Sequence, residues 1–187
     1  KPPILKAQHP DYEMFQFGIH GQRGVSCADC HMPYKSEGGV KFTDHHIQSP
    51  LNNISGSCQV CHRESEETLR NNVYERQDKI KELLGIAEKS LVKAHIEAKT
   101  ALDAGVKIED MKEIHKLIRH AQWRWDYVAA SHGGSFHAPL ESARILATAI
   151  ERSQEAQMKL ALLLTKQGIK YPVTMPDLSS KEKSQVY

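Results

Sequence analysis

Apolar residues recur at spacings of three and four over most of the chain after about residue 65. This spacing places them on one face of an α-helix. It predicts three long helices, over about 65–104, 109–131 and 139–168, each bounded by a glycine of the kind that commonly ends helices. The positions expected to be buried are Ile80, Leu84, Ala87, Leu91, Ala94, Ala98 and Leu102 in the first helix, and Met111, Ile114, Ile118, Ala121, Trp125 and Val128 in the second.

The first 62 residues show no such periodicity, because prolines and glycines divide them into short segments. Only 10–18 is typical of a short helix, with acidic residues in its first turn. We therefore predict a mainly α protein with a loop-rich region over 1–64 and a region of long antiparallel helices over 65–187.

Two smaller expectations concern the helical region. Pro172 and Pro176 predict that the polar tail after residue 168 forms no further helix. Charged neighbours such as Lys93 and Glu97 are interpreted as part of a solvated helix face.

Composition narrows the class of protein. The 187 residues carry a formal net charge of +2, which indicates neither nucleic acid nor an acidic membrane surface as partner. No stretch approaches the roughly 20 apolar residues of a membrane span. The chain has neither a signal peptide nor an initiator methionine, so we expect the numbering to begin inside a longer precursor. The hydrophobic fraction of 40% is low for a globular core, which fits an interior built partly from a cofactor.

All four cysteines belong to two copies of one motif, Cys27-Ala-Asp-Cys30-His31 and Cys58-Gln-Val-Cys61-His62. C-x-x-C-H is the attachment signature of a c-type haem. Two thiols at this spacing reach the two vinyl groups on one edge of the porphyrin, and the histidine that follows binds the iron. The sequence therefore predicts haem at Cys27 and Cys30 and at Cys58 and Cys61. The predicted fold is a mainly α multihaem cytochrome c, in which 1–64 is the loop-rich haem-binding region.

CxxC pairs also occur in two other kinds of site. Paired CxxC motifs also close tetrahedral zinc sites, but zinc does not explain a histidine directly after both pairs. Disulfides across each CxxC occur in redox proteins, but no βαβ pattern surrounds either pair.

Longer motifs give the chain a resemblance to one family, the pentahaem cytochrome c nitrite reductases that form ammonia. The resemblance runs essentially end to end. It is carried by Lys6-Ala-Gln-His9-Pro-Asp-Tyr-Glu13, Gly18-Ile-His20-Gly21, the two CxxCH motifs, Thr43-Asp44-His45, Ile118-Arg-His-Ala-Gln-Trp-Arg-Trp125, Ala130-Ser-His-Gly and Phe136-His137-Ala-Pro139.

The resemblance implies a dissimilatory enzyme that reduces nitrite to ammonium with six electrons. Enzymes of this family carry five haems, four on CxxCH motifs and the catalytic one on a CxxC followed by lysine. This chain holds only the last two attachment motifs. It therefore resembles the C-terminal part of such an enzyme, without the catalytic haem.

The resemblance also assigns the haem-iron ligands on this chain. His31 is proximal to the haem on Cys27 and Cys30, with His137 distal. His62 is proximal to the second haem, with His20 distal. Two imidazoles keep an electron-transfer iron six-coordinate. Nearby glycines at 18, 21, 133 and 134 would let the backbone come close to a porphyrin.

Three further roles follow from the resemblance alone. His45 binds a haem attached outside this chain, although the adjacent His46 leaves open which of the two is the ligand. His9 is the catalytic histidine over the open face of the catalytic haem, where an imidazole can donate a proton. The Lys6 carbonyl and the Gln8 side chain contribute to a calcium site, as neutral oxygens suit this hard cation.

The expected partners are nitrite, the remainder of the same enzyme and a second copy in a homodimer built on the long helices. Trp123, Trp125 and Tyr127 would belong to that dimer interface. The electron donor would be a quinol-oxidising membrane cytochrome or a soluble one. Covalent haem places the protein in the periplasm, with any membrane attachment made through that donor. The alternatives are a multihaem electron carrier without a substrate, and a relative acting on hydroxylamine or a tetrathionate-like sulfur compound.

Overall fold

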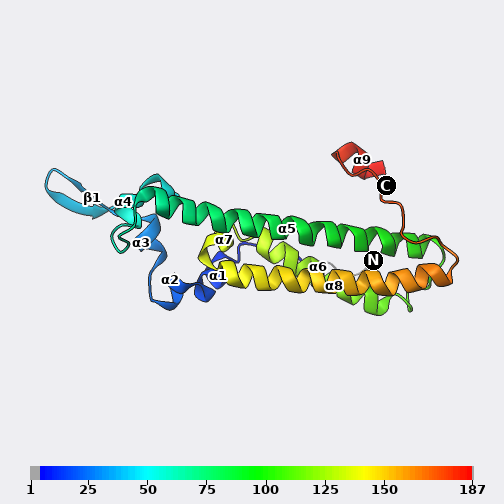
Figure 1. Cartoon of the computed structure of the whole chain (residues 1–187). Coiled ribbons are helices and arrows are strands. Elements are labelled where there is room, and N and C mark those ends of the chain that lie inside the picture. The colour runs from blue at the N-terminus through cyan, green and yellow to red at the C-terminus, as the bar shows by residue number, and fades with distance from the viewer. Residues whose placement is uncertain (1–4, 187) are drawn as a thin grey trace. The chain divides into compact units, whose positions relative to one another are not determined.

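The computed structural model describes residues 5–186 and confirms the predicted mainly α fold class (Figure 1). Three long helices account for most of the second half: α5 (Glu66–Asp103), α6 (Lys112–Ala129) and α8 (Pro139–Lys166). Each lies within the range that the apolar periodicity predicts. The shorter elements are α1 (Asp11–Phe17), α2 (Ile19–Gln22), α3 (Cys27–His31), β1 (Tyr34–Glu37), β2 (Val40–Thr43), η1 (Pro50–Asn52), α4 (Ile54–Ser57), α7 (Gly134–His137) and α9 (Lys181–Val186).

The chain forms two compact units, which are described separately. Among the described residues, the helical unit contains 5–8, 83–129 and 144–186, and the CxxCH unit contains 9–82 and 130–143. Helices α5 and α8 each contribute to both units. The sequence-based division at residue 64 separates loops from helices rather than these compact units, and it stays a prediction.

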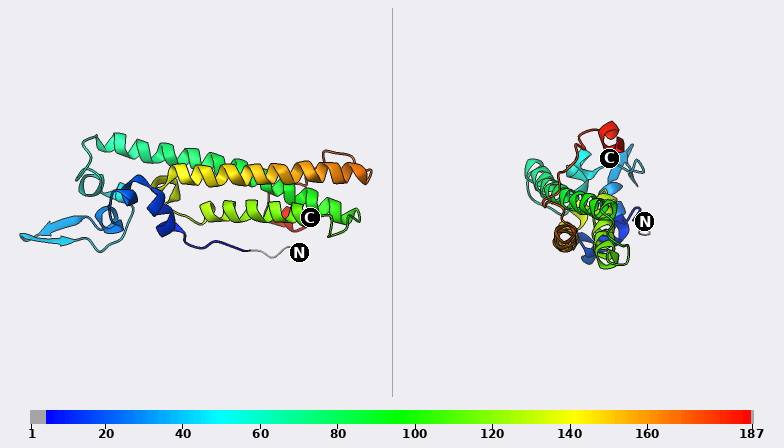
Figure 2. Two further views of the ribbon diagram at one scale, coloured as in Figure 1. Left: turned by 90° about the horizontal axis from the view of Figure 1, so that it is seen from below. Right: turned by 90° about the vertical axis from the view of Figure 1, so that its right-hand side faces the viewer.

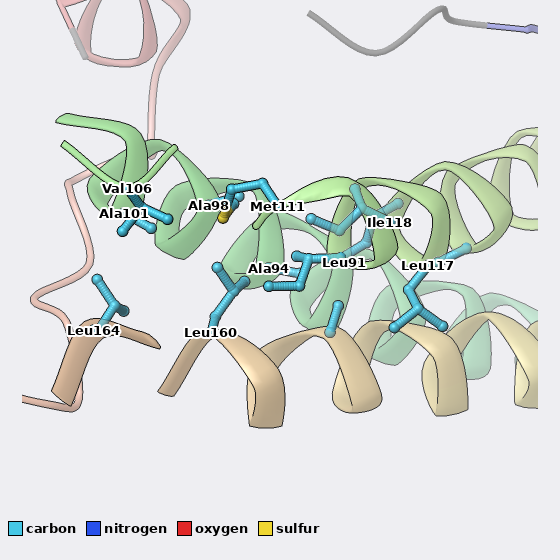
Figure 3. Packing of buried hydrophobic residues seen from close by; sticks show 13 residues of the cluster. Leu91, Ala94, Ala98, Ala101, Val106, Met111, Leu117, Ile118, Leu160 and Leu164 are labelled. Carbon is cyan, nitrogen blue, oxygen red and sulfur yellow. The ribbon is translucent and has the colours of Figure 1, made fainter. Parts of the chain in front are cut away.

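The helical unit is built on one apolar core shared by α5, α6 and α8 (Figures 2 and 3). Its buried residues include most of the positions predicted from periodicity. Leu102 is an exception, since it is 38% exposed and Ala101 takes its place in the core. The core cluster consists of Leu91, Ala94, Ala98, Ala101, Val106, Met111, Ile114, Leu117, Ile118, Ala121, Ala156, Leu160 and Leu164.

Gly105 ends α5 as predicted. Its φ of 86° lies in the left-handed region, which glycine adopts without steric cost. The turn that follows lets the Val106 amide donate to the Ala101 carbonyl, at 3.1 Å. This bond satisfies a carbonyl that the helix end would otherwise leave unpaired.

Two expectations for the helical unit are wrong. Glu97 is fully buried rather than solvated, because α5 turns this residue toward the interior; Lys93 lies 3.8 Å from its carboxylate. The C-terminal tail also contains the short helix α9, which begins directly after Ser180. The Ser180 hydroxyl accepts a hydrogen bond from the Lys183 amide in the first turn. Pro172 and Pro176 lie too far upstream to prevent it.

The CxxCH unit contains several short helices and one antiparallel hairpin. The hairpin was not predicted from the sequence. In the hairpin, Tyr34 pairs with Thr43 and Glu37 with Val40. Gly38 and Gly39 form its turn with φ of 57° and 82°, the positive values that a tight type I′ hairpin turn requires. A Gly-Gly pair between two short runs was the available signal.

Candidate haem site

The first attachment motif forms a single helical turn, α3, which Ser26 caps. The Ser26 hydroxyl accepts a hydrogen bond from the Asp29 amide at 3.3 Å, and the Asp29 carboxylate accepts one from the Ser26 amide at 2.7 Å. This reciprocal pair is a capping box. Residues three and four apart lie on the same helix face, so Cys27, Cys30 and His31 point to one side. That is the arrangement a porphyrin edge needs.

The second motif directly follows α4 and also forms a helical turn. Asn53 caps α4 by accepting from the Gly56 amide at 3.0 Å. Beyond it, the His62 amide donates to the Cys58 carbonyl at 2.9 Å. Cys58 and Cys61 therefore lie one turn apart, with His62 directly after them. Both motifs thus present two thiols and an imidazole in one helical turn.

The structure brings His31 and His137 together. Their ring centroids lie 6.3 Å apart and their planes are nearly perpendicular, at 81°. The His31 Nδ1 lies 2.8 Å from the Gln48 carbonyl. A carbonyl only accepts, so Nδ1 carries the proton and Nε2 is left to bind a metal.

His20 and His62 form a second pair of the same kind, with centroids 6.1 Å apart and planes at 79°. Burial lowers the pKa of His20, and the charges of His62 and Arg76 add to this effect. The Glu64 carboxylate lies 3.7 Å from the His62 Nδ1. Both sequence-predicted pairs are therefore adjacent in space.

His137 is held by unusually close backbone. A Cβ added to Gly18 would lie 1.7 Å from the His137 carbonyl oxygen, and one added to Gly133 would lie 2.3 Å from its ring. Phe15 packs edge-on against the same ring, with centroids 5.5 Å apart. We predicted that these glycines let the backbone come close to a porphyrin. In the structure, the atoms that exclude a side chain here belong to the protein itself.

The residues present fit a haem between each pair of histidines. The His137 Nδ1 is buried and has no hydrogen-bond partner among the residues that the structure describes, a costly state for an isolated polar atom. Burial lowers the pKa of His137, while the Asp11 carboxylate opposes the shift. A low pKa favours the neutral imidazole, which is the form that binds a metal.

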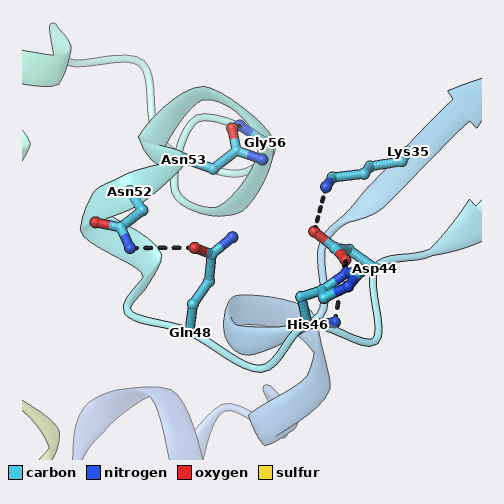
Figure 4. Close-up of polar contacts among 7 residues, drawn as sticks. All are labelled: Lys35, Asp44, His46, Gln48, Asn52, Asn53 and Gly56. Carbon is cyan, nitrogen blue, oxygen red and sulfur yellow. Dashed lines mark hydrogen bonds and ion pairs between the residues drawn. The ribbon is translucent and has the colours of Figure 1, made fainter.

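The region around His45 contains a compact polar cluster (Figure 4). Asp44 is buried, and its carboxylate forms an ion pair with the Lys35 ammonium at 2.5 Å. The same carboxylate accepts a hydrogen bond from the His46 amide at 3.1 Å and lies 2.9 Å from the His46 Nδ1. These partners hold the pKa of Asp44 well below its usual range, the Lys35 hydrogen bond most strongly. His45 is exposed. The cluster therefore occupies one nitrogen of the His46 ring.

Lys6, Gln8 and His9 lie in the segment before α1, and all three are exposed. His9 has a φ of 51°, in the left-handed region that histidine enters only occasionally. Within residues 5–186, no three His, Cys, Asp or Glu side chains converge on a metal site. Calcium takes six to eight oxygens, so Lys6 and Gln8 would supply only part of a shell.

The four thiols are free, and neither CxxC forms a disulfide in this structure. Within residues 5–186, no three cysteine, histidine or carboxylate side chains form a group that could hold a metal ion. Burial raises the pKa of Cys30 and Cys58.

A family model for cytochrome c552 matches residues 1–187. The chain belongs to the cytochrome c552 family. It is 63% identical over 187 residues to cytochrome c-552 of Bacteroides thetaiotaomicron and 49% identical over 186 residues to that of Haemophilus influenzae Rd. These alignments cover 100% and 98% of this chain, but 38% and 34% of the relatives. The chain thus spans about two fifths or less of their length.

A solved structure extends the likeness to the fold. The cytochrome c nitrite reductase of Desulfovibrio desulfuricans, whose catalytic subunit is described with two calcium sites, matches with a TM-score of 0.81 and 38% identity. The match covers 87% of this chain and 35% of that one. The fold is therefore that of a mainly α multihaem cytochrome. Among the described helices of this family member, none is long and apolar enough to cross a membrane.

Sequence reasoning missed three groups that shape this site. Gln48 acts through its backbone carbonyl, which leaves no signal in the residue type. Asp44 was noted only as part of a motif, and its pairing with Lys35 depends on the unpredicted hairpin. Asp11 was interpreted as a favourable first-turn charge, whereas it also binds a distant loop.

Proposed function

We propose that this chain is the C-terminal part of a dissimilatory nitrite reductase that converts nitrite to ammonium with six electrons. Membership of the cytochrome c552 family and the likeness to a cytochrome c nitrite reductase support the substrate and the reaction class. Because the chain spans only part of its relatives, the activity is proposed for the complete protein.

The observation that carries the proposal is the spacing of the two histidine pairs. An imidazole nitrogen bound at about 2 Å from a metal puts its ring centre about 3 Å away, so two rings on opposite sides of one ion lie roughly 6 Å apart. The measured separations are 6.3 and 6.1 Å. Two residues distant in sequence thus stand ready to ligate each of two haem irons.

In this proposal the chain relays electrons rather than binding nitrite at its own haems. Haem supplies one-electron redox chemistry when bound. Cys27, Cys30, Cys58 and Cys61 would attach two haems, and each histidine pair would bind one haem iron. His45 reaches a further haem outside this chain, and His9 donates protons near the substrate. The complete enzyme would carry five haems.

The long helices are proposed to form a homodimer in the periplasm. Trp125 is engaged within its own unit, since its indole donates to the Leu84 carbonyl at 3.3 Å. Exposed apolar residues on α8 are better interface candidates: Met158 is 71% exposed, and Leu162, one turn on, is 66% exposed. Exposed apolar neighbours of this kind mark contact surfaces. Calcium at Lys6 and Gln8, and a cytochrome as electron donor, remain part of the proposal.

One experiment separates this function from that of an electron carrier without a substrate. The complete holoprotein is reduced with a viologen dye, supplied with nitrite, and assayed for ammonium. We expect one ammonium for every six electrons consumed. A holoprotein that oxidises the dye with no ammonium formed from nitrite would favour the carrier. Mass spectrometry of this chain after acid–organic extraction should show two covalent haems, and a bare polypeptide mass would exclude both functions.

A further inference from the structure

Asp11 joins two segments that lie far apart in the sequence. It begins α1, two residues after His9. One of its carboxylate oxygens accepts a hydrogen bond from the Ser131 hydroxyl at 3.1 Å and another from the Gly133 amide at 2.8 Å. Both donors lie in the loop that leads into α7, which ends at His137. A single oxygen therefore attaches the start of α1 to the loop that carries His137.

We infer that Asp11 is a positioning residue that holds the candidate proton donor His9 and the candidate iron ligand His137 in one rigid assembly. This inference rests on the proposed function and adds a component to it. The residues that perform the chemistry are His9 and His137, and Asp11 acts through them.

The surrounding contacts make the attachment stiff. The Gly18 backbone lies so close to the His137 carbonyl that no side chain fits between them, and the Phe15 ring packs against the His137 imidazole. Helix α1 is thus fixed to the His137 loop at both of its ends. On the other side of Asp11, the ring of Pro10 fixes its own φ and the residue is buried. Only this short connection separates Asp11 from His9.

A simpler role for Asp11 is also available. An acidic residue in the first turn stabilises any helix through the helix dipole. Glu13 also lies in the first turn of α1, but it is exposed. The two roles therefore separate experimentally: a helix-dipole role predicts similar effects for both residues, whereas a positioning role predicts an effect at Asp11 alone.

The test compares Asp11→Ala, Asp11→Asn and Glu13→Gln in the complete holoenzyme. Asp11→Ala removes the acceptor for both hydrogen bonds. We expect part of the low-spin electron paramagnetic resonance signal of the haem on Cys27 and Cys30 to convert to high spin, and nitrite turnover to fall at least tenfold. Glu13→Gln should match the wild type in both measurements.

Asp11→Asn keeps an oxygen acceptor but removes the charge. That haem should stay low-spin, and its midpoint potential should rise, because a nearby negative charge stabilises the more positive, oxidised iron. If Asp11→Ala fails to retain haem, the inference requires Asp11→Asn to retain that haem in the low-spin state, because the hydrogen-bond acceptor is still present, and a high-spin signal there would overturn it. So would wild-type spectra and turnover in Asp11→Ala, or equal effects in Glu13→Gln. Failure of the wild type to form ammonium would reject the proposed function alone, because the spectra still report on His137.

Discussion

The imidazole rings of His31 and His137 lie with centroids 6.3 Å apart and nearly perpendicular, although α5 and α6 intervene between them in the sequence. His31 is oriented by the Gln48 carbonyl, and His137 by the close backbone of Gly18 and Gly133. The two rings are thus positioned by different parts of the chain. Such preorganisation reduces the entropy lost when both bind one ion.

The first prediction tests this pair. His137→Ala in the holoprotein should convert one low-spin haem to high spin, because the iron loses one of its two imidazoles. The measurement is electron paramagnetic resonance of the oxidised protein. His132→Ala is the matched control, since His132 lies in the same loop but is exposed. An unchanged low-spin signal in His137→Ala would remove this residue from the ligand set.

The second prediction distinguishes His45 from His46. Asp44 holds the His46 ring through Nδ1 at 2.9 Å, and Asp44 is itself fixed by Lys35. His45 directly follows Thr43-Asp44, as the iron ligand does in the family that the sequence resembles. We therefore expect His45→Ala in the complete enzyme to give one high-spin haem, and His46→Ala to leave all ligation intact. Optical and paramagnetic resonance spectra provide the measurement. The reverse result would make His46 the ligand and would assign Asp44 a role in orienting it.

The helices were predictable because their cores are local patterns. Met111, Ile114 and Ile118 are buried, as their spacing requires. The haem-attachment motifs were predictable because each is complete within five consecutive residues. The helical turn that Ser26 caps at the first motif was not predicted. In contrast, the contact between Asp11 and Gly133 joins residues far apart in sequence. Neither residue type indicates the other as its partner, so this contact can be recognised only in the folded structure.

Glu97 shows a second limit of pattern reading. Its spacing from Lys93 is that of a solvated ion pair on a helix surface, yet the carboxylate is fully buried. Whether a charged position faces water depends on which elements pack against the helix. Here Tyr171, in the segment after α8, packs against the core to which α5 contributes. Burial raises the pKa of the Glu97 carboxyl, and Tyr171 lowers it to a smaller extent.

The third prediction concerns the stability of the helical unit. Burial raises the pKa of Glu97, and the charge of Lys93 opposes the shift only in part. The folded protein therefore binds this proton more tightly than the unfolded chain does. The contribution of Glu97 to stability is most favourable below the ordinary glutamate pKa of about 4.3 and is lost as the pH rises through the raised value.

Glu97→Gln should consequently stabilise the protein at pH 7 by roughly 1 kcal/mol, or a few degrees in Tm, because it removes a weakly paired buried charge. The gain should disappear near pH 4, where the carboxyl is protonated in both states. Thermal unfolding followed by circular dichroism provides the measurement. Glu88→Gln, at an exposed position of the same helix, serves as control. A loss of stability at pH 7 in Glu97→Gln would show that the pair with Lys93 outweighs the cost of burial.

The last prediction concerns His9. Its backbone has a φ of 51°, and asparagine is one of the few other residues that enter this region readily. His9→Asn therefore removes the titratable ring while preserving the local backbone and the attachment of Asp11. Removing one positioned donor from a site of developing charge costs about 3 kcal/mol, or roughly a hundredfold in rate. We expect nitrite turnover by the complete enzyme to fall at least a hundredfold, with every haem attached, reducible and unchanged in spin state. His132→Asn should keep wild-type turnover. Near-normal turnover in His9→Asn would leave this chain with electron-transfer roles alone, because no other histidine within residues 5–186 is proposed to act on the substrate.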